Sequence, residues 1–154
     1  MRAVISRVKS VSVIADGEAR GRGEKGLLVF LGVAPEDSAE DALLLSAKIS
    51  KMRIFSDNNG KMNLSISDIG GTLAVISNFT LYANCSHGNR PDFFGAAQPE
   101  QAKALYQLFL DDITPKVPHC ISGIFGADMQ IQSECDGPVT IVLESSQFKK
   151  EPQT

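Results

Sequence analysis

The run Gly26-Leu27-Leu28-Val29-Phe30-Leu31 decides the fold class of this 154-residue chain. A short, continuous apolar run is typical of a β-strand that is covered on both faces. Upstream of it, residues 4–8 and 11–14 also have the composition of strands. They are followed by Asp16-Gly17, a dipeptide that favours a tight hairpin turn. The sequence therefore predicts a buried strand preceded by an N-terminal hairpin.

Two segments downstream of the buried strand have the periodicity of helices. The first follows Ser38, which favours a helix N-cap, and its apolar residues recur at helical spacing as far as Arg53: Ala42, Leu45, Ile49 and Met52. The second begins at Pro99, since proline is favoured at the first position of a helix. Its apolar face consists of Ala102, Leu105, Tyr106 and Phe109.

The remaining patterns indicate short strands. Residues 54–55 and 62–64 flank a turn sequence and predict a tight hairpin, and further strands are predicted at 73–76, 121–125, 128–133 and 139–143. Two helices among eight or nine strands, many joined by short turns, indicate an α+β fold. We expect a single domain over residues 1–144, in which two main helices pack on mixed or antiparallel β-sheets. A polar, flexible tail is expected at 145–154.

The net charge of −3 argues against a nucleic-acid binder that uses a wide basic face. Residues 1–25, however, contain six Lys or Arg residues and only three acidic residues. An RNA partner could therefore be held through a few local phosphate contacts. The simpler alternative is that an N-terminal hairpin exposes its basic side chains to water.

Cysteine usage and the N-terminal segment predict the cellular compartment. Cys85, Cys120 and Cys135 form no CxxC pair, so neither a disulfide framework nor a zinc site is expected. Arg2 and Arg7 interrupt the N-terminal apolar residues, which therefore lack the apolar core of a signal peptide. The longest apolar run is too short to cross a bilayer. We expect a cytoplasmic protein without a metal, a cofactor or a membrane contact.

The segment Ser77-Asn78-Phe79-Thr80-Leu81 is the first of three candidates for a functional site. It follows a predicted buried strand. Backbone N–H groups at such a strand end can stabilise an oxyanion, and hydroxyl groups can orient a substrate or a water molecule. The alternative is a strand end that is rich in Ser and Thr for structural reasons alone.

The other two candidates contain proline. In Asp136-Gly137-Pro138-Val139-Thr140, the Gly-Pro bond indicates either an ordinary turn or a cis peptide, which is nearly confined to proline. The third candidate is the segment His87 to Phe94, which lies in a long loop of residues 83–97, and loops of this length are commonly functional. Within it, Arg90 could bind a phosphate or pair with Asp92.

Seven blocks, in order and at matching spacing, resemble the D-aminoacyl-tRNA deacylase family from residue 1 to about 144. Each block alone is a weak signal, but the ordered set is highly specific. The blocks are Arg2-Ala3-Val4 with Arg7-Val8, residues 26–33, residues 53–64, Ser77 to Leu81, residues 88–93, residues 125–130 and Asp136 to Thr140.

The resemblance implies hydrolysis of the ester between a D-amino acid and tRNA, and also of mischarged glycyl-tRNA, for chiral proofreading in translation. It implies a homodimer that binds the tRNA acceptor end, with each active site at the subunit interface. A cis Gly137-Pro138 pair, supported by Arg7, would enter the partner's pocket and reject L-amino acids. The resemblance assigns the catalytic pocket to Ser77, Asn78, Phe79 and Thr80, and substrate binding to Gly137, Pro138, Val139, Thr140, Arg7, Phe125 and Met129.

Two positions depart from the family pattern. Asn78 stands where the family has Gln, and Cys135 stands where it has Asn, which removes an amide that can donate and accept hydrogen bonds. A second hypothesis is therefore a catalytically weakened member that binds tRNA 3′ ends or nucleotides, and a third is a dimeric scaffold without nucleic acid. The presence of Gly137-Pro138, Thr80 and Arg7 favours the enzyme, because these residues have no evident packing role.

Overall fold

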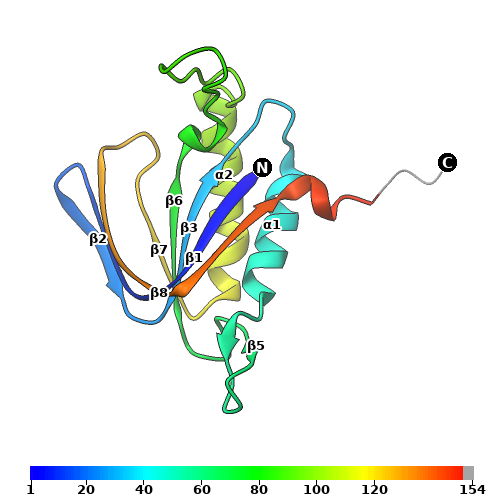
Figure 1. The fold of residues 1–154 in the computed structure, drawn as a ribbon. Helices are drawn as coiled ribbons and strands as arrows, with labels where there is room; N and C mark the ends of the chain where they lie inside the picture. The colour runs from blue at the N-terminus through cyan, green and yellow to red at the C-terminus, as the bar shows by residue number, and fades with distance from the viewer. Residues whose placement is uncertain (151–154) are drawn as a thin grey trace.

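The computed structural model describes residues 1–150 and confirms the α+β fold with two main helices. Figure 1 shows both helices on one side of a strongly curved sheet. The elements are β1 (Arg2–Ala15), β2 (Glu18–Gly23), β3 (Gly26–Gly32), α1 (Ala39–Lys51), β4 (Phe55–Ser56), β5 (Met62–Leu64), β6 (Thr72–Ser77), η1 (Phe79–Tyr82), α2 (Pro99–Ile113), η2 (Thr114–Lys116), β7 (His119–Ser122), β8 (Met129–Glu144) and η3 (Ser145–Phe148).

The main sheet has six strands and mixed topology. Its order is β2-β1-β3-β6-β7, and β8 pairs with β1. β1 is antiparallel to β2, β3 and β8, whereas β3 and β7 are both parallel to β6. The curvature brings β2 close to β7, where Arg20 Nε donates to the Ser122 carbonyl at 3.3 Å. β4 and β5 form the predicted separate hairpin.

β3 is covered on both faces, as its apolar run predicts. Leu27, Val29 and Leu31 contact the core between the sheet and the helices, and Leu28 belongs to a second core inside the curl of the sheet. Gly26 allows β3 to approach β6 closely, since a Cβ atom there would lie only 1.8 Å from the Thr72 carbonyl oxygen. This close pairing places the ends of β3 and β6 side by side.

The two long strands differ from the sequence-based expectation. Residues 4–8 and 11–14 were expected as separate strands but belong to the single strand β1, and residues 128–133 and 139–143 both belong to β8. β1 and β8 pair along nearly their whole lengths, with register shifts between Ser6 and Ser10. The Gly137-Pro138 pair therefore lies inside a strand and is not a turn between two strands. The strand expected at 121–125 ends at Ser122, and α1 ends at Lys51 rather than Arg53.

The prediction of a flexible tail from Ser145 is wrong for its first residues. Residues 145–148 form η3, and the backbone N–H of Ser145 donates to the Met1 carbonyl at 2.9 Å. Ser145 is buried, and Phe148 packs against the main core. The last four residues of the expected tail lie outside the described part of the chain.

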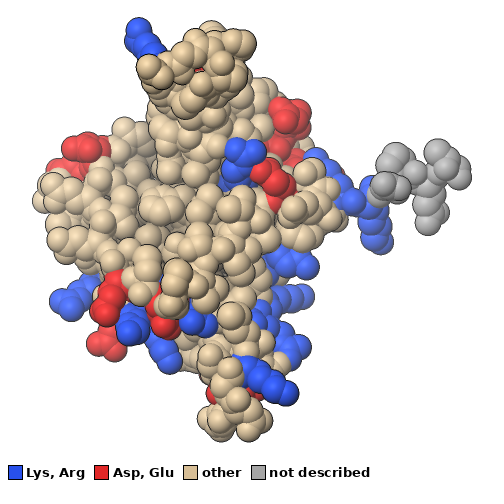
Figure 2. All heavy atoms as spheres, in the orientation of Figure 1, with Lys and Arg blue, Asp and Glu red and all other residues tan. Residues whose placement is uncertain are grey.

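Charged side chains are unevenly spread over the face of the sheet that is turned away from the helices. Figure 2 shows few of them in the middle of this face, where they gather mainly toward the edges. Val142 of β8 is 55% exposed there, and its partner in the register, Val4 of β1, is half-buried. Within residues 1–150, no helix is long and apolar enough to cross a bilayer.

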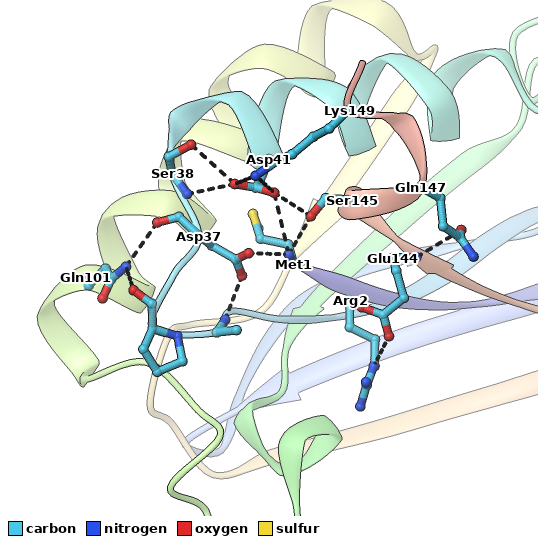
Figure 3. A network of polar contacts seen from close by, with 12 residues as sticks. Met1, Arg2, Asp37, Ser38, Asp41, Gln101, Glu144, Ser145, Gln147 and Lys149 are labelled. Atoms are coloured by element: carbon cyan, nitrogen blue, oxygen red, sulfur yellow. Dashed lines mark hydrogen bonds and ion pairs between the residues drawn. The ribbon is translucent and has the colours of Figure 1, made fainter. Parts of the chain in front are cut away.

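A buried ionic network closes the sheet against α1 (Figure 3). The Asp41 side chain, 1% exposed, accepts hydrogen bonds from the Ser145 hydroxyl at 2.6 Å, the Ser38 N–H at 2.8 Å and Lys149 Nζ at 3.0 Å. The Met1 ammonium lies 4.0 Å from the same carboxylate. Burial alone would raise the pKa of Asp41, but these hydrogen bonds and the ammonium outweigh it and hold that pKa well below its usual range.

We expect Asp41→Asn to lower the free energy of unfolding at pH 7 by about 2–4 kcal/mol. The substitution removes the negative charge of the carboxylate that the surrounding ammonium groups and hydrogen-bond donors face in the buried network. A lowered native pKa stabilises the fold above the pKa of the unfolded chain, and this contribution is lost as pH falls. The difference in stability between wild type and variant should therefore shrink progressively as the pH falls below about 4. Chemical denaturation at several pH values measures this. Glu40→Gln, at an exposed position beside Asp41, is the control and should change stability by less than about 0.5 kcal/mol.

Candidate active site

The segment Ser77 to Leu81 lies where β6 leaves the sheet. Ser77 is the last residue of β6 and pairs with Leu31, and the Asn78 N–H donates to the Leu31 carbonyl at 2.8 Å. Phe79 and Thr80 then begin η1. Because the first N–H groups of a helix have no acceptor within that helix, this turn can offer backbone donors to a bound group.

A cavity of about 470 Å³ adjoins this segment. It lies among the ends of β3 and β6, the start of α2 and the turn that follows β7. Five of the predicted site residues line it: Ser77, Asn78, Phe79, Phe125 and Met129. The structure thus brings together two segments that are about fifty positions apart in the chain. A cavity of this size, with mostly apolar walls, is suited to a small organic group.

Tyr106 of α2 also lines the cavity, although the sequence indicated only a helix core position. Its hydroxyl donates to the Val75 carbonyl at 3.0 Å, and its ring lies 6.0 Å from that of Phe125. Burial raises the pKa of Tyr106 to about 12, so the phenol stays neutral. Helical periodicity could not have identified this role, because a side chain facing a core and one facing a cavity have the same spacing.

The Thr80 hydroxyl lies outside the lining of the cavity and is exposed. It donates a hydrogen bond to the Asn78 side-chain oxygen at 2.5 Å. This acceptor is an amide oxygen, which is too weak a base to activate a nucleophile. No carboxylate, histidine or lysine of residues 1–150 is hydrogen-bonded to this hydroxyl.

The Gly137-Pro138 bond is cis, as the resemblance to the family implied. Arg7 lies directly beside this pair: its Nε atom is 3.3 Å from both the Asp136 carbonyl oxygen and the Asp136 carboxylate. Arg7 Nη1 also donates to the Ile54 carbonyl at 2.8 Å, and the side chain is only 12% exposed. The guanidinium therefore holds this part of β8 against the segment that precedes β4.

The pair does not line the cavity of its own chain. Gly137, Pro138 and Thr140 are exposed, Val139 is half-buried, and none of the four contributes to the cavity wall. Apart from Thr80 and Arg7, the predicted site residues thus fall into two groups: one group surrounds the cavity, and the other forms an outward-facing part of β8.

The long loop contributes Phe93 to the cavity wall. Arg90 is exposed, and it has no ion pair within residues 1–150. Asp92 instead accepts a hydrogen bond from the Phe94 N–H at 3.3 Å. Of the two roles considered for Arg90, pairing with Asp92 is therefore not observed. No group of three His, Cys, Asp or Glu side chains in the described chain is arranged to hold a metal ion.

The chain is similar to known proteins over nearly its whole length. A family model described as D-Tyr-tRNA(Tyr) deacylase matches residues 4–144. The D-aminoacyl-tRNA deacylase of Fervidobacterium nodosum is 47% identical over 145 residues, which are 94% of this chain and 97% of the relative. The D-aminoacyl-tRNA deacylase of Dictyoglomus turgidum is 47% identical over 150 residues, which are 97% and 96% of the two chains.

Two solved structures have the same fold. The c-Myc DNA Unwinding Element Binding Protein aligns with a TM-score of 0.85 and 38% identity, over 94% of this chain and 98% of its own. A probable eukaryotic D-amino acid tRNA deacylase aligns with a TM-score of 0.78 over 93% and 98% of the two chains, and its 16% identity bears on the fold alone. With the family match and the close relatives over nearly the full length, this chain belongs to the D-aminoacyl-tRNA deacylase family of hydrolases.

Proposed function

We propose that this chain hydrolyses the ester that joins a D-amino acid to the 3′ end of tRNA, releasing the free amino acid and the tRNA. The cavity at the end of β6 carries this proposal, because Phe79 lines it and also begins η1, whose first N–H groups are those of Phe79 and Thr80. Fixed N–H donors in a largely apolar site stabilise the oxyanion that forms when an ester is attacked. Phe125 and Met129 supply an apolar wall for the terminal adenosine.

In this proposal the enzyme is a homodimer, and the Gly137-Pro138 pair of one subunit enters the cavity of the other. Its backbone carbonyls would collide with the side chain of an L-amino acid but not with that of a D-amino acid. Three observations support this: the pair is exposed, Arg7 holds it in place, and the adjoining sheet face has few charges in its middle (Figure 2). Mischarged glycyl-tRNA would also be a substrate, because glycine has no side chain to reject.

The reaction needs only water besides the aminoacyl-tRNA. Hydrolysis of an ester involves no electron transfer, so the proposal includes no redox cofactor, and it assigns no step to a metal. Charged tRNA is present where translation takes place, and we place the enzyme in the cytoplasm.

Incubation with D-tyrosyl-tRNA and L-tyrosyl-tRNA, with the loss of each ester followed over time, tests the activity. We expect the D ester to be lost about a hundredfold faster or more, and the L ester to decay at its spontaneous rate. Equal loss of both, or no loss of either, overturns the activity. Small-angle scattering tests the assembly separately, and a monomeric mass overturns the interface between subunits.

Asn78→Gln and Cys135→Asn restore the residues usual in the family, and together we expect them to change kcat/KM by less than tenfold, under about 1.4 kcal/mol. The reason is that Asn78 is held by its own backbone N–H bond to Leu31, and Cys135 is exposed. Single-turnover rates on D-tyrosyl-tRNA measure the change. A gain of about a hundredfold or more would instead favour the weakened member that binds tRNA ends.

A further inference from the structure

Two phenylalanines, Phe79 and Phe93, line the cavity, and Phe94 follows Phe93 in the chain; we call the three residues the aromatic rim. Phe79 and Phe93 line the cavity and meet edge to face, with ring centroids 4.9 Å apart. Phe79 is 57% exposed, and Phe94 is 90% exposed, the highest value among the large apolar side chains that are exposed in the described chain. An exposed ring therefore lies one position along the chain from the cavity wall.

The backbone around Phe94 is firmly held. Asn84 and Asp92 exchange two backbone hydrogen bonds of 2.9 Å, and the Phe94 N–H donates to the Asp92 carboxylate. Just beyond, the Ala97 N–H donates to the Val33 carbonyl at 2.9 Å, which ties the end of the loop to the residue after β3. Figure 1 shows this loop projecting beyond the ends of β6 and α2. With Phe79 and Phe93 at the cavity, this exposed ring is a candidate surface for a ligand that extends out of the cavity.

We infer that Phe94 is a stacking platform for the unpaired base that precedes the terminal nucleotide of the substrate. This inference rests on the proposed function, which places the terminal nucleotide and its amino acid inside the cavity. The preceding nucleotide then lies outside, at the mouth, where the aromatic rim continues to Phe94. Unpaired RNA bases stack on exposed aromatic rings, and this contact tolerates any base because every base has a π-face.

The charge of the same loop fits an RNA strand. Arg90, four residues before Phe94, is exposed and has no ion pair among residues 1–150. A free guanidinium next to a stacking ring can bind the phosphate that links two stacked nucleotides. One loop would therefore hold both the base and the backbone of the single-stranded end.

The test compares Phe94→Leu, which keeps an apolar side chain but removes the ring, with Phe94→Tyr, which keeps the ring. The substrates are D-tyrosyl-tRNA and D-tyrosyl-adenosine, which lacks the preceding nucleotide. We expect Phe94→Leu to raise KM for the tRNA substrate by about five- to 150-fold with kcat unchanged. Phe94→Tyr should behave as wild type, and D-tyrosyl-adenosine should be cleaved equally by all three proteins. Met62→Ala, at an exposed apolar position of β5, is the control.

Three results would overturn the inference. An equal effect on both substrates would mean that Phe94 shapes the cavity, and an unchanged KM in Phe94→Leu would mean that the ring binds no base. A lower mass of Phe94→Leu in scattering would place the ring between two copies of the chain. If wild type cleaves neither ester, the proposed function fails. In that case, the stacking inference is tested by calorimetric binding of a cytidine–cytidine–adenosine trinucleotide without hydrolysis. Weaker binding by Phe94→Leu than by wild type supports stacking, and equal binding excludes it.

Discussion

Gly137→Ala is expected to lower kcat/KM for D-tyrosyl-tRNA by about a hundredfold or more, because small displacements of a positioning group have effects of this order. Gly137 has a φ of +131°, a conformation that L side chains rarely adopt. A Cβ atom there would lie 2.7 Å from the Val139 nitrogen, closer than real Cβ atoms come, and 3.4 Å from Arg7 Nη2, which is an ordinary contact. The Val139 nitrogen belongs to the backbone and cannot move aside as a flexible side chain could. The Gly137-Pro138 segment must therefore shift.

The matched control is Gly17→Ala, in the turn between β1 and β2. Gly17 also has a positive φ, +81°, but no atom lies within 4 Å of a Cβ built there. The control should unfold at a somewhat lower temperature, by about 1 kcal/mol of lost stability, and keep its activity. Single-turnover kinetics and thermal unfolding are measured on both variants. Full activity of a folded Gly137→Ala would remove the pair from the active site, and a lowered ratio of D to L hydrolysis would strengthen its assignment as the chiral gate.

Local sequence patterns predicted most of the helices and strands, because helix caps, turns and apolar periodicity depend on residues that are close together in the chain. The N-cap of α1 lies at Ser38 as expected, with the Ser38 N–H donating to Asp41, and α2 begins at Pro99. The long strands could not be predicted as such, because the pairing of β1 with β8 is a contact between opposite ends of the chain. Ser145 was misjudged for the same reason: its polar neighbours indicate a tail, but its hydroxyl bonds to Asp41, which lies 104 positions away.

The candidate site, like the fold, was predicted from the sequence only in part. The blocks around Ser77 and Phe125 were predicted from a resemblance, and the parallel pairing of β3, β6 and β7 explains why they meet at one cavity. Tyr106 was not assigned to the site, and Phe93 was predicted only as part of a candidate loop segment, because their roles depend on which faces α2 and the long loop turn to the cavity. The outward position of Gly137-Pro138 could not be predicted from the residues of one chain, because its proposed role involves a second copy of the chain.

The source of chemical assistance is the last question that the site raises. Thr80 is the hydroxyl in the pocket motif that could attack an ester, but its proton is donated to the Asn78 amide oxygen. An unassisted hydroxyl is a weak nucleophile at neutral pH. The substrate, in contrast, has a 2′-hydroxyl next to the ester on its terminal ribose. This group can orient the attacking water or share its proton, while the N–H groups at the start of η1 stabilise the oxyanion.

We therefore expect Thr80→Ala to change the single-turnover rate by less than about tenfold, a loss of local positioning rather than of a nucleophile. A D-tyrosyl-tRNA that ends in 2′-deoxyadenosine should be cleaved about 10² to 10⁴ times more slowly, the usual range for lost general acid–base assistance. Competition assays must show that the deoxy substrate still binds, so that the loss falls on the chemical step. The opposite pattern, an inactive but folded Thr80→Ala and a normally cleaved deoxy ester, would identify Thr80 as the nucleophile. Thr80→Val, similar in shape but without the hydroxyl, separates the two readings: water attack predicts an active variant, because only the shape of the turn is then required.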